Sequence, residues 1–227
     1  MHYFGPDYIS FFKDLAPNNH KGWFDQNRKR YEESVKKPFQ KFHTDLTEAI
    51  KKIDPKIPKD LVATKQIFRI NRDIRFSKDK TPYKLHMSAV VAPEGKKDYT
   101  NPGLYYEINP EQVVLYGGIY ACSTSQLAKI RAYIASHLDA FQNAIQNPMF
   151  EKYYQEGILG EKMKRLPKEL KNVAEKEPLM YNKSFYYRTF LSIDEIFENN
   201  LLERIIALYE VSFPVRNFLR SALNNEG

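Results

Sequence analysis

The sequence predicts an α+β domain in which an antiparallel, meander-like sheet of about four strands packs against N-terminal and C-terminal helices. Helical patterns dominate residues 1–60, strand patterns residues 65–120, and helical patterns again residues 123–223. Grouped helices and strands, rather than a strict alternation, are typical of α+β folds. Since 227 residues suit one large domain, we expect a single domain over residues 1–227.

The N-terminal part is expected to form helices interrupted by prolines. Residues 6–16 carry apolar side chains at helical spacing, so we expect a short helix there. A long helix should follow from about His20, because the preceding Asn19 is a good N-cap, and Pro38 should kink or divide it. Asn27 within this helix needs a polar partner, and it is a candidate to hold the sheet or a nearby loop in place.

Four segments in the middle of the chain have the pattern of strands. We expect these strands at Gln66–Phe76, Leu85–Ala92, Leu104–Asn109 and Val113–Tyr120. The sequence Asn109-Pro110-Glu111-Gln112 predicts a turn with proline second, so the last two strands form a hairpin. In this hairpin Tyr106 and Tyr105 point to opposite faces. Short connections make an antiparallel meander the simplest topology.

The C-terminal part is expected to be helical. Ser123 and Gln126 have the spacing of a capping box ahead of a helix, and Ser192 and Glu195 repeat that spacing. Pro214 should bend the helix that follows the second box, because proline cannot continue the helical hydrogen-bond pattern.

Positive charge is concentrated in one segment. The net charge is +7, and Lys65–Lys84 holds seven cations against only Asp73 and Asp79. A diffuse excess often serves solubility alone, but this excess is local. In an extended strand Arg72 falls among apolar neighbours, where a charge without a partner costs several kcal/mol. Arg72 therefore needs an anion, either a carboxylate of the protein or a bound ligand.

The turn after this expected strand can surround a phosphate or a carboxylate with lysines. Arginine would supply planar bidentate contacts and lysine a point charge. We therefore expect a small anionic ligand to bind here. The candidate ligand-binding residues are Arg69, Arg72, Arg75, Lys78, Lys80, Tyr83 and Lys84.

Two alternatives remain open for the basic segment. Asp73 and Asp79 can pair with the neighbouring cations, which would make the segment a scaffold network of a structural or interaction module. The same basic surface can instead bind nucleic acid, with Tyr105 and Tyr116 stacking on bases. The sequence has no recognised nucleic-acid-binding motif.

Whether the protein is an enzyme is left open, and the candidate catalytic residues are His86 and Asp73. His86 directly follows the basic segment and can act as a general acid or base beside a bound anion, or serve as an ordinary strand histidine. No metal site and no cofactor are expected, because the histidines lack metal-binding spacing and Cys122 has no second cysteine. Gly117-Gly118 predicts close packing or a bulge, not a phosphate loop.

Several classes of protein are disfavoured by the sequence. Residues 1–15 lack the basic start and apolar run of a secretory signal. No apolar run approaches the ~20 residues needed to cross a bilayer, so we expect no membrane partner. A single cysteine excludes an intramolecular disulfide, and we expect a cytoplasmic protein of undetermined oligomeric state.

The segment Arg72–Lys84, RDIRFSKDKTPYK, resembles the signature of a widespread uncharacterised family found largely in bacteria and some fungi. It is the domain of unknown function numbered twenty-four sixty-one. Asn18-Asn19 and Pro102-Gly103 are further matches, and the resemblance extends over nearly the whole chain. Glu169 stands where the family tends to have glycine, so that loop is expected to differ in shape. The resemblance implies no activity, because none is established for the family.

Overall fold

A computed structural model of the chain describes residues 1–97 and 101–224. Contacts divide the chain into two compact units, which are described separately. Unit 1 comprises Met1–Val91, Tyr105–Leu115 and Phe190–Ile206, and unit 2 comprises Ala92–Leu104, Tyr116–Thr189 and Ala207–Gly227.

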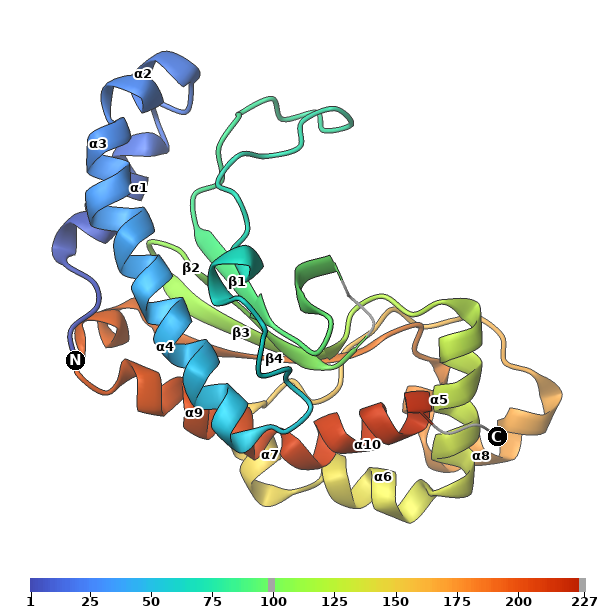
Figure 1. Ribbon diagram of the computed structural model, residues 1–227. Coiled ribbons are helices and arrows are strands. Elements are labelled where there is room, and N and C mark those ends of the chain that lie inside the picture. Colours follow the sequence, from blue (N-terminus) through green and yellow to red (C-terminus); the bar gives the residue numbers. More distant parts are fainter. Residues whose placement is uncertain (98–100, 225–227) are drawn as a thin grey trace. The chain divides into compact units, whose positions relative to one another are not determined.

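The sheet is a four-stranded antiparallel meander, so the predicted α+β class is confirmed. Its strands are β1 (Met87–Val91), β2 (Gly103–Ile108), β3 (Gln112–Ile119) and β4 (Phe185–Ser192), paired in that order (Figure 1). The predicted hairpin between β2 and β3 is present. Its turn is closed by a 3.1 Å hydrogen bond from the Asn109 amide to the Gln112 carbonyl.

The fourth strand is not the one expected from the sequence. Gln66–Phe76 forms no strand of the sheet, and only the isolated bridge between Ile67 and Ala89 joins it to β1. The strand prediction for that segment is wrong. β4 instead lies within the range expected to be helical, where buried residues alternate with more exposed ones, from Phe185 to Leu191. This alternation is the period of a strand with one covered face.

The N-terminal helices of unit 1 are interrupted near the positions expected from the sequence. They are α1 (Pro6–Leu15), α2 (Lys21–Gln26), α3 (Arg28–Arg30) and α4 (Lys37–Ile53). Between α3 and α4 the chain makes a π-helical segment, Tyr31–Lys36, and Pro38 is the second residue of α4. Proline cannot donate to the preceding turn, so this helix is divided near the predicted position. A short 3₁₀ helix, Ala63–Gln66, follows.

Aromatic side chains of α1 and α4 cover one face of β2. Phe39 stacks on Tyr106 with ring centroids 5.6 Å apart, and Phe42 meets the same ring edge-on at 5.9 Å. Tyr8 donates a 3.2 Å hydrogen bond to the Ile108 carbonyl. Burial of each such side chain contributes about 1.5–3 kcal/mol. The opposite face of β2, with Tyr105 and Glu107, is only half-buried, as the alternation of the strand predicts.

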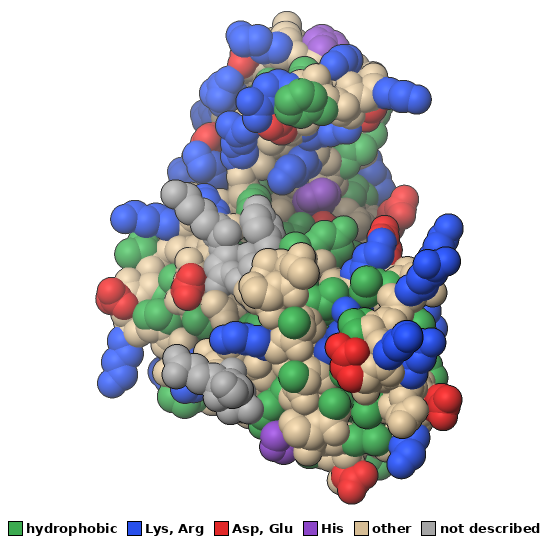
Figure 2. Space-filling view, turned by 90° about the vertical axis from the view of Figure 1, so that its right-hand side faces the viewer, with side chains coloured by type: hydrophobic (Ala, Val, Ile, Leu, Met, Phe, Trp, Pro, Cys, Tyr) green, Lys and Arg blue, Asp and Glu red, His purple; other side chains and the backbone are tan. Residues whose placement is uncertain are grey.

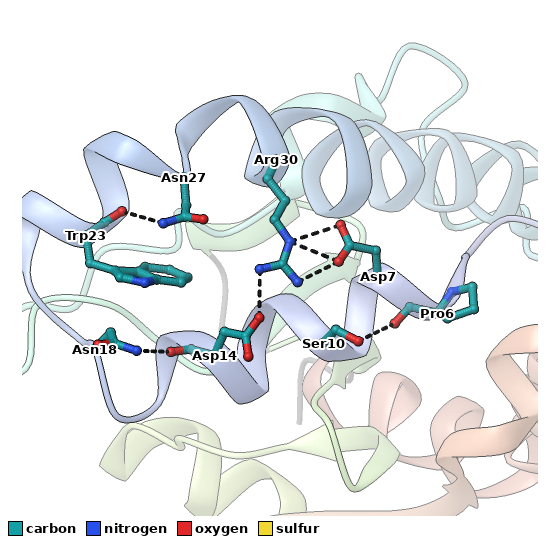
Figure 3. Close-up of polar contacts among 8 residues, drawn as sticks. All are labelled: Pro6, Asp7, Ser10, Asp14, Asn18, Trp23, Asn27 and Arg30. Atoms are coloured by element: carbon teal, nitrogen blue, oxygen red, sulfur yellow. Dashed lines mark hydrogen bonds and ion pairs between the residues drawn. The ribbon is translucent and has the colours of Figure 1, made fainter.

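An ion-paired arginine fastens α3 to α1 (Figure 3). The Arg30 guanidinium donates from Nε to Asp7 at 2.9 Å and from Nη1 to Asp14 at 2.8 Å. The two carboxylates lie seven residues, about two turns, apart on the same side of α1, so one planar guanidinium reaches both. This contact sets the position of α3, which directly follows α2 in the chain.

Unit 2 has a hydrophobic core of its own. Its helices are α5 (Thr124–Ser136), α6 (Leu138–Ile145), α7 (Pro148–Tyr153), α8 (Lys171–Lys176) and α10 (Phe213–Asn224), with 3₁₀ turns at Gly95–Lys97, Lys168–Leu170 and Pro178–Tyr181. Phe141, Phe150 and Phe185 are among the fully buried residues of this core. The capping box between Ser123 and Gln126 is present as predicted.

Two further expectations concern helix and strand geometry. Ser192 caps only a 3₁₀ helix, Ile193–Phe197. The next helix, α9 (Leu201–Val211), ends before α10 begins, so the chain breaks near Pro214 and does not bend within one helix. Gly118 has φ +85°, and a Cβ there would lie 2.3 Å from the Phe185 carbonyl oxygen. The close packing expected at the paired glycines is therefore present.

Candidate functional site

The basic segment forms a two-limbed projection from unit 1, which we call the basic arm (Arg69–Lys84). In Figure 1 it runs outward ahead of β1 and returns to that strand. The limbs are joined by hydrogen bonds of 2.8 Å, from the Arg72 amide to the Pro82 carbonyl and from the Lys84 amide to the Ile70 carbonyl. The limbs pair with each other and project away from β1, so they do not extend the sheet.

The arm is anchored to the start of α2. The Asn19 side chain donates to the Tyr83 carbonyl at 2.9 Å and accepts from the Tyr83 amide at 3.1 Å. The Tyr83 ring stacks on Phe24 with centroids 4.1 Å apart. The sequence suggested Asn27 for this holding role, but Asn27 donates to the Trp23 carbonyl within its own helix (Figure 3). Asn19 is thus the clamp of the arm, and His20 caps α2 in its place.

Within the arm, both aspartates pair with arginines. Arg72 donates to Asp79 and to the Thr81 hydroxyl, and Arg75 donates to Asp73 with an Nη2–Oδ2 distance of 2.7 Å. Hydrogen bonds from Arg75 lower the pKa of Asp73 to about 2. The Thr81 amide and then Arg72 lower the pKa of Asp79 to about 2. The anion that Arg72 requires is therefore supplied by the chain itself.

The base of the arm holds one lysine over an aromatic ring, with a second cation, Arg69, nearby. Lys84 lies with its ammonium 5.5 Å from the centroid of Phe68, whose ring meets Tyr105 edge-on at 5.8 Å. Burial lowers the pKa of Lys84; nearby Glu107 opposes this shift, and the charge of Arg69 adds to it. No carboxylate among residues 1–97 and 101–224 forms an ion pair with Arg69 or Lys84.

A titratable pair lies beside these cations. His86 Nε2 is 3.6 Å from Glu107 Oε2, and the Tyr105 hydroxyl donates to the same oxygen at 3.1 Å. Burial lowers the pKa of His86, Glu107 raises it, and the charge of Lys84 lowers it further. The side chains of His86 and Glu107 are 27% and 20% exposed, so solvent and small solutes reach both. A neutral imidazole oriented by a carboxylate is suited to accept a proton.

The structure does not gather all the expected site residues at one point. Arg69, Lys84 and His86 lie together at the base of the arm. Tyr83 faces α2, and the Lys80 ammonium donates to the Ile74 carbonyl at 3.0 Å. The remaining candidates, Arg72, Asp73, Arg75 and Lys78, lie further along the arm.

Lysine and arginine side chains crowd the upper part of the face in Figure 2, the end at which the basic arm lies in Figure 1. Sequence reasoning placed this charge correctly but missed Glu107 as a partner of His86. The available signal was the half-buried alternation of β2, which sets the Glu107 carboxylate on the less covered face.

Metal and thiol chemistry find little support in the described part of the chain. Over residues 1–97 and 101–224, no three His, Cys, Asp or Glu side chains form a group that could hold a metal ion. Burial raises the pKa of the Cys122 thiol to about 11, which disfavours the reactive thiolate. The same residues include no helix that is long and apolar enough to span a bilayer.

The family described as conserved hypothetical protein (DUF2461) matches residues 7–218. The chain belongs to this family. The matched range contains the whole basic arm together with His86 and Glu107, so the resemblance inferred from RDIRFSKDKTPYK is confirmed. No curated protein and no solved structure matches the chain. Membership of the DUF2461 family brings no activity with it, so function must be argued from the site.

Proposed function

We propose that this DUF2461 domain binds a small phosphorylated or carboxylated ligand at the base of the basic arm, with Arg69 and Lys84 as its anion contacts. The supporting observation is that the half-buried Lys84 ammonium lies 5.5 Å from the centroid of the Phe68 ring, with the charge of Arg69 near enough to lower its pKa. Neither cation has an ion-pair partner among the residues that the structure describes. A half-buried ammonium with a second, exposed cation nearby favours an anion beside them.

His86 is the proposed proton acceptor if the bound ligand reacts. Its imidazole is kept neutral by burial and lies against Glu107, which is itself held by Tyr105. Asp73 is a poor general base near neutral pH, because its pKa is lowered and its carboxylate is already bonded to Arg75. Of the two catalytic candidates from the sequence, the geometry therefore favours His86.

A thermal-shift measurement with inorganic phosphate, pyrophosphate and citrate tests the binding proposal. A ligand that binds only the folded protein, at about 100 times its Kd, should raise Tm by roughly 5–10 °C. The double variant R69Q/K84Q should lose this rise. Its matched control is K168Q/K171Q, which removes the same charge from two exposed lysines of unit 2.

Sodium chloride at matched ionic strength separates specific binding from general salt effects. The proposal fails if no anion raises Tm above the chloride control. It also fails if R69Q/K84Q and K168Q/K171Q lose the response equally.

A structural role for the middle of the arm is a second candidate, favoured by the internal pairs of Arg72 and Arg75. On this hypothesis R72A and D79A should each loosen the arm. Because exposed ion pairs contribute about 0.2–1 kcal/mol, the expected loss of Tm is only a few degrees. Amide hydrogen exchange over residues 70–84 should rise in both variants, while the phosphate response at Arg69 and Lys84 persists. Unchanged exchange in both variants would contradict the structural role.

A further inference from the structure

Phe76 is the most exposed large apolar side chain in the described part of the protein, with 94% of its surface open to solvent. It lies at the outer end of the basic arm, between Arg75 and Ser77. A single exposed apolar side chain is common and carries no functional meaning by itself. The setting of Phe76 is what indicates a function.

The arm is ordered by its own contacts around this side chain. The Ile74 carbonyl accepts hydrogen bonds from the Ser77 amide at 3.4 Å and from the Lys80 ammonium at 3.0 Å. The guanidinium of Arg75 is fixed by Asp73 and lies 5.7 Å from the centroid of the Phe76 ring. A contact presented in a fixed conformation loses less entropy when a partner binds.

The same contacts leave the arm with an excess of positive charge. The two aspartates are occupied by Arg72 and Arg75. Lys78 is exposed and forms no ion pair with any described residue; Arg69 and Lys84 at the base also form none. The arm therefore offers a ring face, a neighbouring guanidinium and ammonium groups to an anionic partner.

We propose that the tip of the basic arm binds single-stranded nucleic acid, with a base stacked on Phe76 and a phosphate at Lys78. Stacking of one base on an aromatic side chain contributes about 1–3 kcal/mol, to which phosphate contacts add. This interaction goes beyond the small-anion site proposed at Arg69 and Lys84, and it does not depend on that site.

An anionic membrane is the competing partner for a basic loop with an exposed aromatic residue. Stable membrane binding requires more buried apolar surface than one phenylalanine side chain provides. A whole myristoyl chain gives only marginal membrane binding. The neighbours of Phe76 are Arg75 and Ser77, so no second apolar side chain adjoins it in the chain. The charge and the single ring face therefore favour a nucleic-acid strand.

Fluorescence anisotropy of labelled oligothymidine and oligouridine, each of about twelve nucleotides, tests the proposal with the full chain. The wild type should bind, with a Kd that rises steeply with sodium chloride. F76A should weaken binding by about 5- to 150-fold, which corresponds to the stacking contribution. K78Q should reduce the slope of log Kd against log salt by about 0.7, the value for one phosphate contact.

Three matched variants distinguish base stacking on Phe76 from a general apolar contact. F76W should retain binding, since tryptophan also offers a ring face, whereas F76L keeps an apolar side chain without one and should behave as F76A. Y120A removes another exposed aromatic, 69% open to solvent in unit 2, and should have no effect. The proposal is overturned if no oligonucleotide binds at about 50 mM salt. It is equally overturned if F76A or F76L binds as the wild type does.

Vesicles of phosphatidylcholine with phosphatidylserine test the competing membrane role. Phe76-dependent sedimentation with vesicles, without oligonucleotide binding, would replace this proposal with a membrane role. The small-anion proposal is tested independently, because F76A should leave the rise of Tm with phosphate intact. R69Q/K84Q should abolish that response while stacking on Phe76 remains.

Discussion

His43 is a buried, uncharged histidine of unit 1, and it couples folding to pH. Its side chain is fully buried on α4, with Nδ1 3.1 Å from the Tyr106 hydroxyl. Burial lowers the pKa of His43 from 6.5 to about 4. Between these two values the unfolded chain binds a proton that the folded chain excludes.

We therefore expect stability to be lost on acidification through this window. The contribution of neutral His43 is complete above about pH 6.5, and it declines by about 1.4 kcal/mol per pH unit as the pH falls toward 4. Urea unfolding at a series of pH values measures this slope. H43Q should lack it, whereas Y106F, which removes the same hydrogen bond but keeps the imidazole, should retain it. Equal slopes for H43Q and the wild type would contradict the assignment.

At the scale of elements, the basic arm depends on a clamp from the turn before α2. Asn19 bonds both the amide and the carbonyl of Tyr83, in the manner of a strand neighbour, and Phe24 stacks on the Tyr83 ring. These contacts fix the base of the arm near α2. The arm itself contributes little apolar burial, so its order depends on polar contacts of this kind.

Removal of the clamp should loosen the arm without unfolding unit 1. N19A deletes two hydrogen bonds, each contributing about 0.5–1.5 kcal/mol. Amide exchange and trypsin cleavage within residues 70–84 should therefore increase. The control is N18A, because the neighbouring Asn18 bonds only the Asp14 carbonyl of its own helix end. Equal protection of the arm in N19A and N18A would argue against the clamp.

At the scale of the whole molecule, the residues that carry the surplus positive charge are not those that form the hydrophobic cores. The surplus of cations is concentrated on the basic arm, whose charged side chains lie outside the packed cores. The core of each unit consists of aromatic and aliphatic side chains from its own helices and strands. The protein can therefore vary the charge of its arm at little cost to packing, and the variants proposed for the arm should fold.

Much of the fold could be predicted because its signals are local. The β2–β3 hairpin follows from a four-residue turn, the start of α5 from the capping box at Ser123, and the division before α4 from Pro38. The α+β class follows from the grouping of such segments along the chain. The excess of charge in Arg69–Lys84 was equally visible, since composition needs no coordinates.

By itself, then, the sequence determined the α+β class, the hairpin, the family and the location of the basic segment. The tertiary structure decided which cations are internally paired and which are not, because Asp73 and Asp79 had several possible partners. It also decided that Asn19 holds Tyr83 across 64 residues and that Glu107 lies against His86. Such contacts join distant parts of the chain, and no spacing or propensity within one segment encodes them.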